Sequence, residues 1–181
     1  MPTTTRRTSR TASKSRARTN GAGNGARTNG TGNILVLLKR DHQEVKDMFE
    51  QIEGLSERAT EQRRRLGEKI CTALEAHSKL EKAILYSEFR QRAEDHEERE
   101  EVLEAYEEHE IVDRLVSELK GMNPSDERYE AKMMVLAESV RHHIKEEEGE
   151  MFRTVRELFE KDELAEMGQR FAEGKRRAGL E

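Results

Sequence analysis

The stretch MMVLAESVRHHIKEEEGEMFRTV, residues 133–155, is the most informative about the fold. In it, polar residues occupy positions of a helical hydrophobic pattern. Its apolar residues recur in one frame built from steps of three and four, at Met133, Leu136, Val140, Met151 and Val155. This spacing places them on one face of an amphipathic helix. His143 and Glu147 occupy the same frame, four residues apart and therefore one turn apart on that face. The stretch predicts a helix that presents an imidazole and a carboxylate to a helical core.

Three further segments show the same period, and each places a histidine at a core-facing position. The first begins at Ile34, ends near Gly54 and is lined by Leu35, Leu38, His42, Val45, Phe49 and Ile52. The second begins near Thr60 and is lined by Leu66, Ile70, Ala73, His77, Glu81 and Ile84. The third runs from about Glu97 to Lys120 and is lined by Val102, Tyr106, His109, Val112 or Asp113, Val116 and Leu119.

Four long helices joined by short connections favour antiparallel packing. We therefore predict an all-α fold, with an antiparallel up-down-up-down four-helix bundle over residues 34–160. A shorter amphipathic segment, from about Asp162 to Lys175 within residues 161–181, is expected to dock on the bundle as a lid or end-cap.

Composition narrows the class of protein. Of the 181 residues, 39% are charged and 4% are aromatic, which argues against a β-sandwich or β-barrel. No run approaches the roughly 18 apolar residues of a transmembrane helix, and no apolar segment near the N-terminus matches a secretory signal. We therefore expect a cytoplasmic protein with no membrane partner. The single cysteine, Cys71, excludes an intramolecular disulfide and a multi-cysteine zinc site, and is interpreted as a packed thiol.

The charge is distributed unevenly. Seven of the 33 Lys and Arg residues, and none of the 38 Asp and Glu residues, lie in residues 1–33. This segment also lacks Val, Ile, Leu and aromatic residues, so we predict a disordered tail. Such a tail suits contact with nucleic acid or another acidic partner, or a purely solubilising role, and the absence of aromatic residues that could stack on bases favours the solubilising role.

The chemistry is concentrated where polar residues interrupt the apolar stripes. His42, His77, His109 and His143 lie one on each helix, and His77 and His143 are each followed four residues later by a glutamate, Glu81 and Glu147. A buried carboxylate without a partner is costly, and a metal ion offsets that cost. These residues predict two metal ions bridged by Glu81 and Glu147. Nitrogen and oxygen ligands without thiolate suit iron or manganese and permit zinc.

Other polar residues leave alternatives open. Asp113, four residues after His109, is either a third carboxylate of the site or a helix-surface residue. Tyr106 either hydrogen-bonds a small ligand at the site or packs as a core tyrosine. His142 lies about 100° around the helix from His143, and the frame of Val140 favours His143. Two Glu-x-x-His motifs, which ferritin-like di-iron bundles use, are absent.

Four segments carry a family resemblance: LKRDHQEVKDMFE (38–50), EAHSKLEKAILY (75–86), EAYEEHEIVDRLVSEL (104–119) and RHHIKEEEGEMF (141–152). Together the chain over residues 34–156 resembles the hemerythrin-like, or HHE cation-binding, family. The resemblance implies an antiparallel four-helix bundle around a non-haem di-iron centre that interacts with dioxygen or related small molecules. The ligands it implies are His42, His77, Glu81, His109, His143 and Glu147.

The sequence also departs from the family pattern. Oxygen-carrying hemerythrins have HxxxH on the third helix and HxxxxD on the fourth, whereas this chain has Asp113 after His109 and HxxxE on the fourth helix. These differences argue against simple reversible oxygen carriage. Ser87 and Arg153 replace prolines that are frequent in the family, so the second and fourth helices are expected to continue without a break.

The resemblance leads to two functional hypotheses. The first is a di-iron protein that binds or reacts with dioxygen, peroxide or nitric oxide for storage, sensing or detoxification, with peroxide decomposition as the first enzymatic activity to test. The second is a helical scaffold that holds metal structurally while its basic tail recruits nucleic acid or an acidic partner.

Overall fold

The computed structural model describes residues 32–56 and 58–180, and no strand occurs among them. The helical elements are α1 (Ile34–Glu53), α2 (Thr60–Glu81), η1 (Lys82–Tyr86), α3 (Ser87–Arg92), α4 (His96–Lys120), α5 (Glu127–Glu146), η2 (Glu147–Met151), α6 (Phe152–Leu158) and α7 (Lys161–Arg177). The predicted all-α class is therefore confirmed. The tail assigned to residues 1–33 lies outside the described residues, apart from Gly32 and Asn33.

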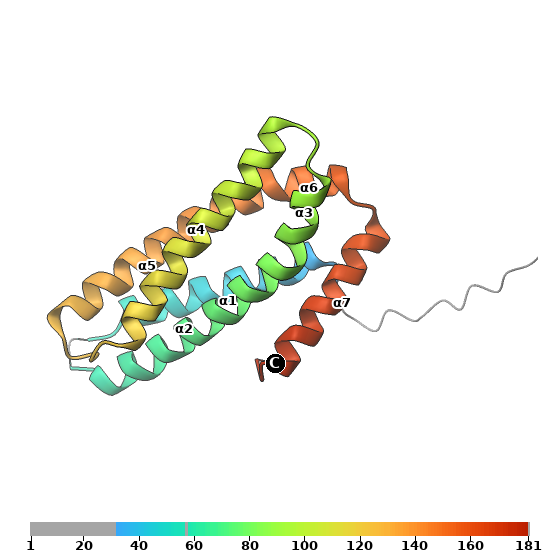
Figure 1. The fold of residues 1–181 in the computed structure, drawn as a ribbon. Helices are drawn as coiled ribbons and strands as arrows, with labels where there is room; N and C mark the ends of the chain where they lie inside the picture. The colour runs from blue at the N-terminus through green and yellow to red at the C-terminus, as the bar shows by residue number, and fades with distance from the viewer. Residues whose placement is uncertain (1–31, 57, 181) are drawn as a thin grey trace, which may run out of the picture.

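Four long helices, α1, α2, α4 and α5, lie side by side and form the body of the molecule (Figure 1). The connections after α1 and after α4 lie at the same end, as antiparallel neighbours require (Figure 1). Side-chain caps fix where these helices begin: the Asn33 side chain accepts a hydrogen bond from the Val36 N–H, and Asp95 forms a capping box with Glu98.

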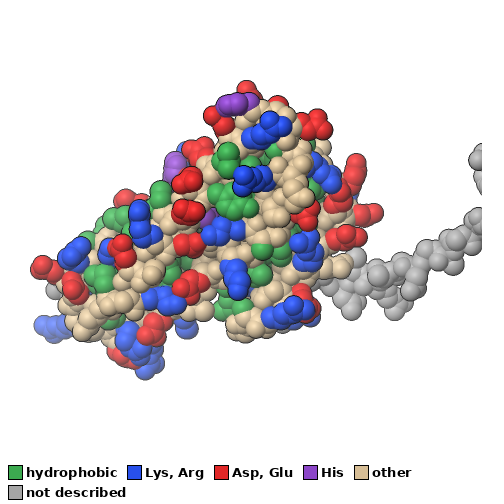
Figure 2. All heavy atoms as spheres, in the orientation of Figure 1, with side chains coloured by type: hydrophobic (Ala, Val, Ile, Leu, Met, Phe, Trp, Pro, Cys, Tyr) green, Lys and Arg blue, Asp and Glu red, His purple; other side chains and the backbone are tan. Residues whose placement is uncertain are grey.

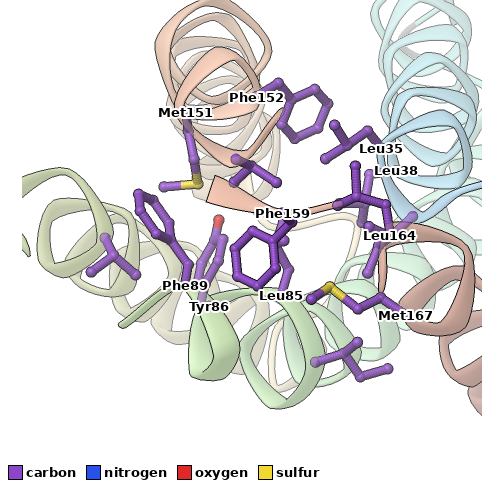
Figure 3. Packing of buried hydrophobic residues seen from close by; sticks show 14 of the residues in the cluster. Leu35, Leu38, Leu85, Tyr86, Phe89, Met151, Phe152, Phe159, Leu164 and Met167 are labelled. Carbon is purple, nitrogen blue, oxygen red and sulfur yellow. The ribbon is translucent and has the colours of Figure 1, made fainter. Parts of the chain in front are cut away.

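The apolar core consists of two clusters separated along the bundle by the polar residues of the four stripes. One cluster is rich in aromatic residues and includes Tyr86, Phe89, Phe152 and Phe159 (Figure 3). The other is mainly aliphatic and lies toward the connections after α1 and α4. Every polar interruption, such as His42 between Leu38 and Val45, falls between the two clusters. Apolar packing therefore holds the polar layer from both sides.

Two π-helical segments interrupt the long helices. The segment η1 follows Glu81 directly, and η2 begins at Glu147. The chain stays helical through both, so α2 continues into α3 and α5 into α6, but the backbone widens at each point. Both helices therefore continue without a break, as expected, and the feature that the sequence did not predict is the change of turn type next to each buried glutamate. Single π turns inside α-helices are frequent at functional sites.

The helix α7 docks on the bundle as expected, and of the two arrangements considered it forms a lid that packs lengthwise against α1 and α2, not an end-cap (Figure 1). Phe171 is its fully buried anchor, and a side chain at Gly168 would collide with the backbone carbonyl of Gly32. This close approach requires glycine and ties α7 to the start of α1. The position of α7 brings Lys175 to Asp41, whose carboxylate oxygen lies 2.6 Å from the Lys175 ammonium nitrogen.

Acidic and basic side chains are interspersed over the face shown in Figure 2, with apolar side chains between them. Within residues 32–56 and 58–180, no helix combines the length and apolarity needed to cross a membrane.

Candidate metal centre

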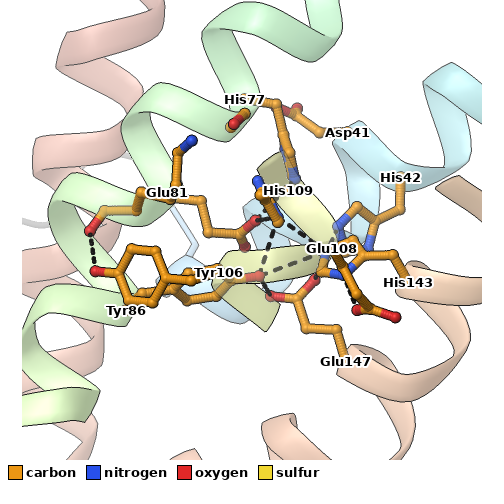
Figure 4. Close-up of polar contacts among 12 residues, drawn as sticks. Asp41, His42, His77, Glu81, Tyr86, Tyr106, Glu108, His109, His143 and Glu147 are labelled. Atoms are coloured by element: carbon orange, nitrogen blue, oxygen red, sulfur yellow. Dashed lines mark hydrogen bonds and ion pairs between the residues drawn. The ribbon is translucent and has the colours of Figure 1, made fainter. Parts of the chain in front are cut away.

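The structure brings together the six side chains that the sequence singled out (Figure 4). Four helices and one π segment supply them: His42 from α1, His77 and Glu81 from α2, His109 from α4, His143 from α5 and Glu147 from η2. All are buried except His77, whose side chain keeps 11% of its exposure. Glu81 is completely buried. Each residue faces inward because its helix uses the same stripe to bury apolar residues on either side.

The histidine Nε2 atoms point at the two carboxylates. One oxygen of Glu81, Oε2, lies 3.0 Å from Nε2 of His77 and 3.3 Å from Nε2 of His109. The Oε2 atom of Glu147 lies 3.2 Å from Nε2 of His42 and 3.6 Å from Nε2 of His143. Each glutamate therefore contacts histidines from two different helices, which is the geometry that a bridging ligand needs.

Two trios of side chains are close enough to hold a metal ion each. They are His42, His77 and Glu81, and Glu81, His109 and His143; within each trio the ligand atoms lie within 4.8 Å of one another. Glu81 belongs to both trios. Two metal ions held by these trios would consequently share the Glu81 carboxylate.

Carboxylates behind the histidines form hydrogen bonds with two of the four rings, and a third ring faces a carboxylate at longer distance. Glu148 Oε1 lies 2.9 Å from Nδ1 of His42, and Glu108 Oε2 lies 2.8 Å from Nδ1 of His143. Because an ionised carboxylate can only accept a hydrogen bond, each Nδ1 donates, and a neutral ring then turns the Nε2 lone pair inward. Metal-binding histidines are oriented in this way.

The third ring, His77, has a looser arrangement. Its Nδ1 lies 3.7 Å from Asp41 Oδ2, beyond hydrogen-bond distance, while Asp41 itself is held by Lys175. Asp41 and Glu108 were not singled out from the sequence, and Glu148, about 100° around the helix from Glu147, was expected to be solvated and dispensable for iron binding, whereas it contacts His42. Each of these acids is next in sequence to a residue of the cluster but faces a histidine on a different helix. An acidic residue directly beside a core histidine or glutamate was therefore the feature of the sequence that could have indicated them.

Tyr86 is a further residue of the site that the sequence analysis missed. Its hydroxyl lies 3.1 Å from His109 Nε2 and 3.4 Å from His143 Nε2, and it donates to Glu147 Oε1 at 3.5 Å. Tyr86 follows Glu81 by five residues, an offset that leaves the core face in an α-helix. The π turn of η1 restores the alignment because its hydrogen bonds span five residues.

Of the two roles that the sequence allowed for Tyr106, hydrogen bonding to a ligand at the site or packing as a core tyrosine, the structure shows packing in the core. The Tyr106 hydroxyl donates to the backbone carbonyl of Lys82 at 3.3 Å, and its ring packs edge-on against Tyr86, with centroids 5.3 Å apart. Tyr106 is therefore a core tyrosine that supports Tyr86.

The close carboxylates drive the pKa values of the cluster apart. Burial raises the pKa of Glu81, but His77 and His109 outweigh it and hold that pKa well below its ordinary value. Burial and the neighbouring charge of Glu81 raise the pKa of Glu147 to about 7. Burial lowers the pKa of His77, but Glu81 and Asp41 outweigh it and raise that pKa to about 10. When no metal is bound, protons on His77 and Glu147 thus offset the negative charge of the two buried carboxylates, Glu81 and Glu147.

Three alternatives from the sequence lie outside the cluster. Asp113 faces outward, where it accepts hydrogen bonds from Ser78 Oγ at 3.1 Å and from Lys82 Nζ at 2.6 Å. The side chain of His142 is 64% exposed, so the structure places His143 in the cluster. Cys71 is a buried thiol whose pKa is raised to about 11, chiefly by burial.

A cavity of about 100 Å³ adjoins the histidines. Its wall is largely apolar and includes Val45, Leu74, Val112, Val140 and Ile144, while Lys175 and Leu180 line it near the C-terminal end of the described chain. A single water needs roughly 10–15 Å³ by a comparable measure, so the cavity has room for a small ligand beside the cluster.

The hydrogen bonding of the buried ligand atoms indicates that this set of donors suits metal ions. Both oxygens of Glu81, Nε2 of His42 and Oε2 of Glu147 are buried without a hydrogen-bond partner. Glu81 Oε2, His42 Nε2 and Glu147 Oε2 do lie 3.0 to 3.6 Å from other atoms of the cluster, but without hydrogen-bond geometry, and a native protein retains such buried polar atoms for a reason. Coordination of a cation by these nitrogen and oxygen atoms supplies that reason.

Comparison with known proteins agrees with this geometry. The family model for the hemerythrin HHE cation binding domain matches residues 33–155, which is more than half of the chain. The crystal structure of a hemerythrin HHE cation binding domain-containing protein from Mycobacterium kansasii superposes with a TM-score of 0.68. The match covers 81% of this chain and 88% of that chain at 23% identity, and it shows a shared fold.

A curated relative extends the comparison to another class of protein. A DNA nickase from Nostoc sp. strain PCC 7120 is 23% identical over 143 residues. The match covers 79% of this chain but 39% of the nickase, so the chain spans well under half the length of that relative.

Proposed function

The chain belongs to the hemerythrin HHE cation-binding family, and on that premise we propose that its buried cluster holds two metal ions, mostly iron, for the binding or reaction of dioxygen, peroxide or nitric oxide. The observation that carries the proposal is the sharing of Glu81 between two ligand trios. Manganese and zinc also accept these donors, but zinc has no redox chemistry, and the family resemblance favours iron over manganese.

Each residue has a defined part in this proposal. His42 and His77 would hold one ion, His109 and His143 would hold the other, and Glu81 would be shared by both. Glu147, placed between His42 and His143, would supply a second shared carboxylate. The two irons would supply a redox pair that exchanges electrons with a small ligand without an external cofactor.

The chain's own residues shape access and proton supply. The apolar cavity wall favours neutral small molecules, because transfer of a charge into such a cavity is costly. Burial and the charges of Glu147 and Glu81 raise the pKa of Tyr86 well above its ordinary value, so its hydroxyl keeps its proton at neutral pH. Tyr86 can therefore donate a hydrogen bond at the inner side of the cluster.

A spectroscopic experiment tests the proposal. The protein is loaded anaerobically with Fe²⁺ and then exposed separately to dioxygen, hydrogen peroxide and nitric oxide. New charge-transfer absorbance in the near-ultraviolet and visible, with a yellow to brown colour, is expected for at least one of them. Consumption of peroxide over many turnovers would identify an enzyme. Full iron loading with an unchanged spectrum for all three ligands would favour a structural metal site.

Recruitment of nucleic acid is a second candidate role, motivated by the similarity to a DNA nickase and by the basic composition of residues 1–33. Deletion of residues 1–31, which keeps Gly32 and its contact with Gly168, should leave the melting temperature and metal content unchanged but abolish any DNA binding. Binding through this segment should weaken steeply with salt, because phosphate neutralisation releases counterions. DNA affinity that survives the deletion would contradict the role of the segment. A cytoplasmic location also remains a prediction.

A further inference from the structure

A second, acidic opening reaches the cluster from the side of α4 and the α5–η2 segment. It is a cleft of about 40 Å³, lined by six glutamates together with Ala105, His143 and Met151; the glutamates are Glu101, Glu104, Glu108, Glu146, Glu147 and Glu150. No Lys or Arg lines it. In this the cleft differs from the largely apolar cavity that adjoins the histidines.

The negative charges of Glu101, Glu104 and Glu150, at the outer end of the cleft, have few positive charges near them. Within the described part of the chain, no Lys or Arg forms an ion pair with Glu101, Glu104 or Glu150, whereas acids on α2 such as Glu61 and Glu68 are paired with arginines. Burial raises the pKa of Glu101 and the nearby charge of Glu150 adds to this shift, and together they outweigh the hydrogen bond with Thr154 and the charge of Arg153, which lower it. A cation entering the cleft would relieve this repulsion.

The inner end of the cleft leads to unsatisfied ligands. The Glu147 side chain is 1% exposed, lines the cleft and keeps Oε2 without a hydrogen-bond partner. His143, also at the inner end, is held in place by Glu108 Oε2 at 2.8 Å. The cleft therefore connects exposed acids, at Glu104 and Glu150, with buried acceptor atoms of the cluster.

We propose that this acidic cleft between α4 and the α5–η2 segment is the entry path by which a divalent cation such as Fe²⁺ reaches the buried cluster. The inference rests on the proposed function, since it supplies that site with its metal. The cleft and the apolar cavity then have different roles: cations enter past the glutamates of the cleft, and neutral small ligands occupy the apolar cavity.

The test measures the rate of metal uptake separately from the amount bound. Metal-free protein is mixed anaerobically with Fe²⁺ at low ionic strength, and protein-bound iron is quantified after rapid desalting at timed intervals. The variant carries Glu101→Gln, Glu104→Gln and Glu150→Gln, none of which alters the cluster. The control carries Glu107→Gln, Glu110→Gln and Glu138→Gln, which remove the same charge outside the cleft.

The cleft variant should take up iron about tenfold more slowly than the control, because a charged cleft raises the local cation concentration. Its final iron content should equal that of the wild-type protein. The difference should vanish near 1 M salt, where the Debye length is about 3 Å. The single variant Glu104→Gln, at an exposed position, should show a smaller slowing in the same direction if the triple variant proves unstable.

Equal uptake rates for the cleft variant and the control would overturn the entry path, as would a slowing that persists at high salt. A lower final iron content at an unchanged rate would also overturn it and would make these acids ligands. Failure of the wild-type protein to bind iron at all would instead contradict the proposed function.

Discussion

Replacement of Glu148 by alanine removes the carboxylate that holds the His42 ring. The hydrogen bond from His42 Nδ1 to Glu148 Oε1 is 2.9 Å long, and the Glu148 side chain is 25% exposed. A hydrogen bond to a charged group contributes about 1.5–3 kcal/mol, and partial exposure favours the lower end of that range. Loss of a partner behind a metal-binding histidine typically weakens metal affinity by roughly 10–100-fold. We therefore expect about tenfold weaker metal binding for Glu148→Ala.

Competition with a chelator of known affinity, at fixed pH and ionic strength, measures this change. Glu138→Ala removes an exposed acid from the neighbouring helix α5 and should leave the affinity unchanged. Glu148→Gln should recover part of the loss, because the amide oxygen still accepts from Nδ1. The reasoning is refuted if Glu148→Ala binds metal as tightly as Glu138→Ala, or if glutamine at this position is no better than alanine.

Other variants and conditions probe the same cluster. His143→Ala should abolish most iron binding while His142→Ala retains it, as elemental analysis would show; the reverse result would place the frame of α5 one residue off. Glu81→Ala should lower the iron content to less than half, because both ligand trios lose a member, and retention of two ions would refute the bridge. Apparent metal affinity should rise with pH, by up to tenfold per unit for each proton released, since His77 with a pKa of about 10 and Glu147 with a pKa of about 7 hold protons that metal displaces. Both folded-state pKa values lie above the ordinary ones, 4.5 for Glu147 and 6.5 for His77, so the stability that these two groups give the metal-free protein is lost as pH rises, through 7 for Glu147 and through 10 for His77. The melting temperature of metal-free protein should therefore fall from pH 7 to pH 10, and a melting temperature that climbs over this range would contradict the shifts.

Helix geometry made the six clustered residues predictable. An interval of four residues places His77 with Glu81, and His143 with Glu147, on one face whatever the rest of the chain does. Apolar residues on both sides of each pair then fix that face as the buried one. The site follows from local periodicity, and for this reason the sequence alone indicated it.

The features that were missed depend on departures from that periodicity or on contacts between helices. Tyr86 faces the cluster through a π turn, which the period of 3.6 residues does not include. Glu108 and Glu148 lie off the apolar stripes, and their role in the site depends on contacts with histidines on neighbouring helices. Asp113 was equally compatible with a ligand until Lys82 and Ser78 were found beside it.

The placement of α7 was unpredictable for a similar reason. An amphipathic helix requires an apolar surface to cover, but its own sequence does not specify which one. The contact between Gly168 and the backbone at Gly32 determines the lengthwise packing, and such a close approach becomes visible only in three dimensions.

Metal content per chain tests the central claim most directly. Protein produced in iron-replete medium and analysed by elemental analysis against an accurate protein concentration should contain close to two metal ions per chain, mostly iron. Five of the six inward donors form two trios that share Glu81, with Glu147 beside them, and this arrangement predicts two ions. A stoichiometry near one, or zinc in place of iron, would contradict a bridged di-iron centre.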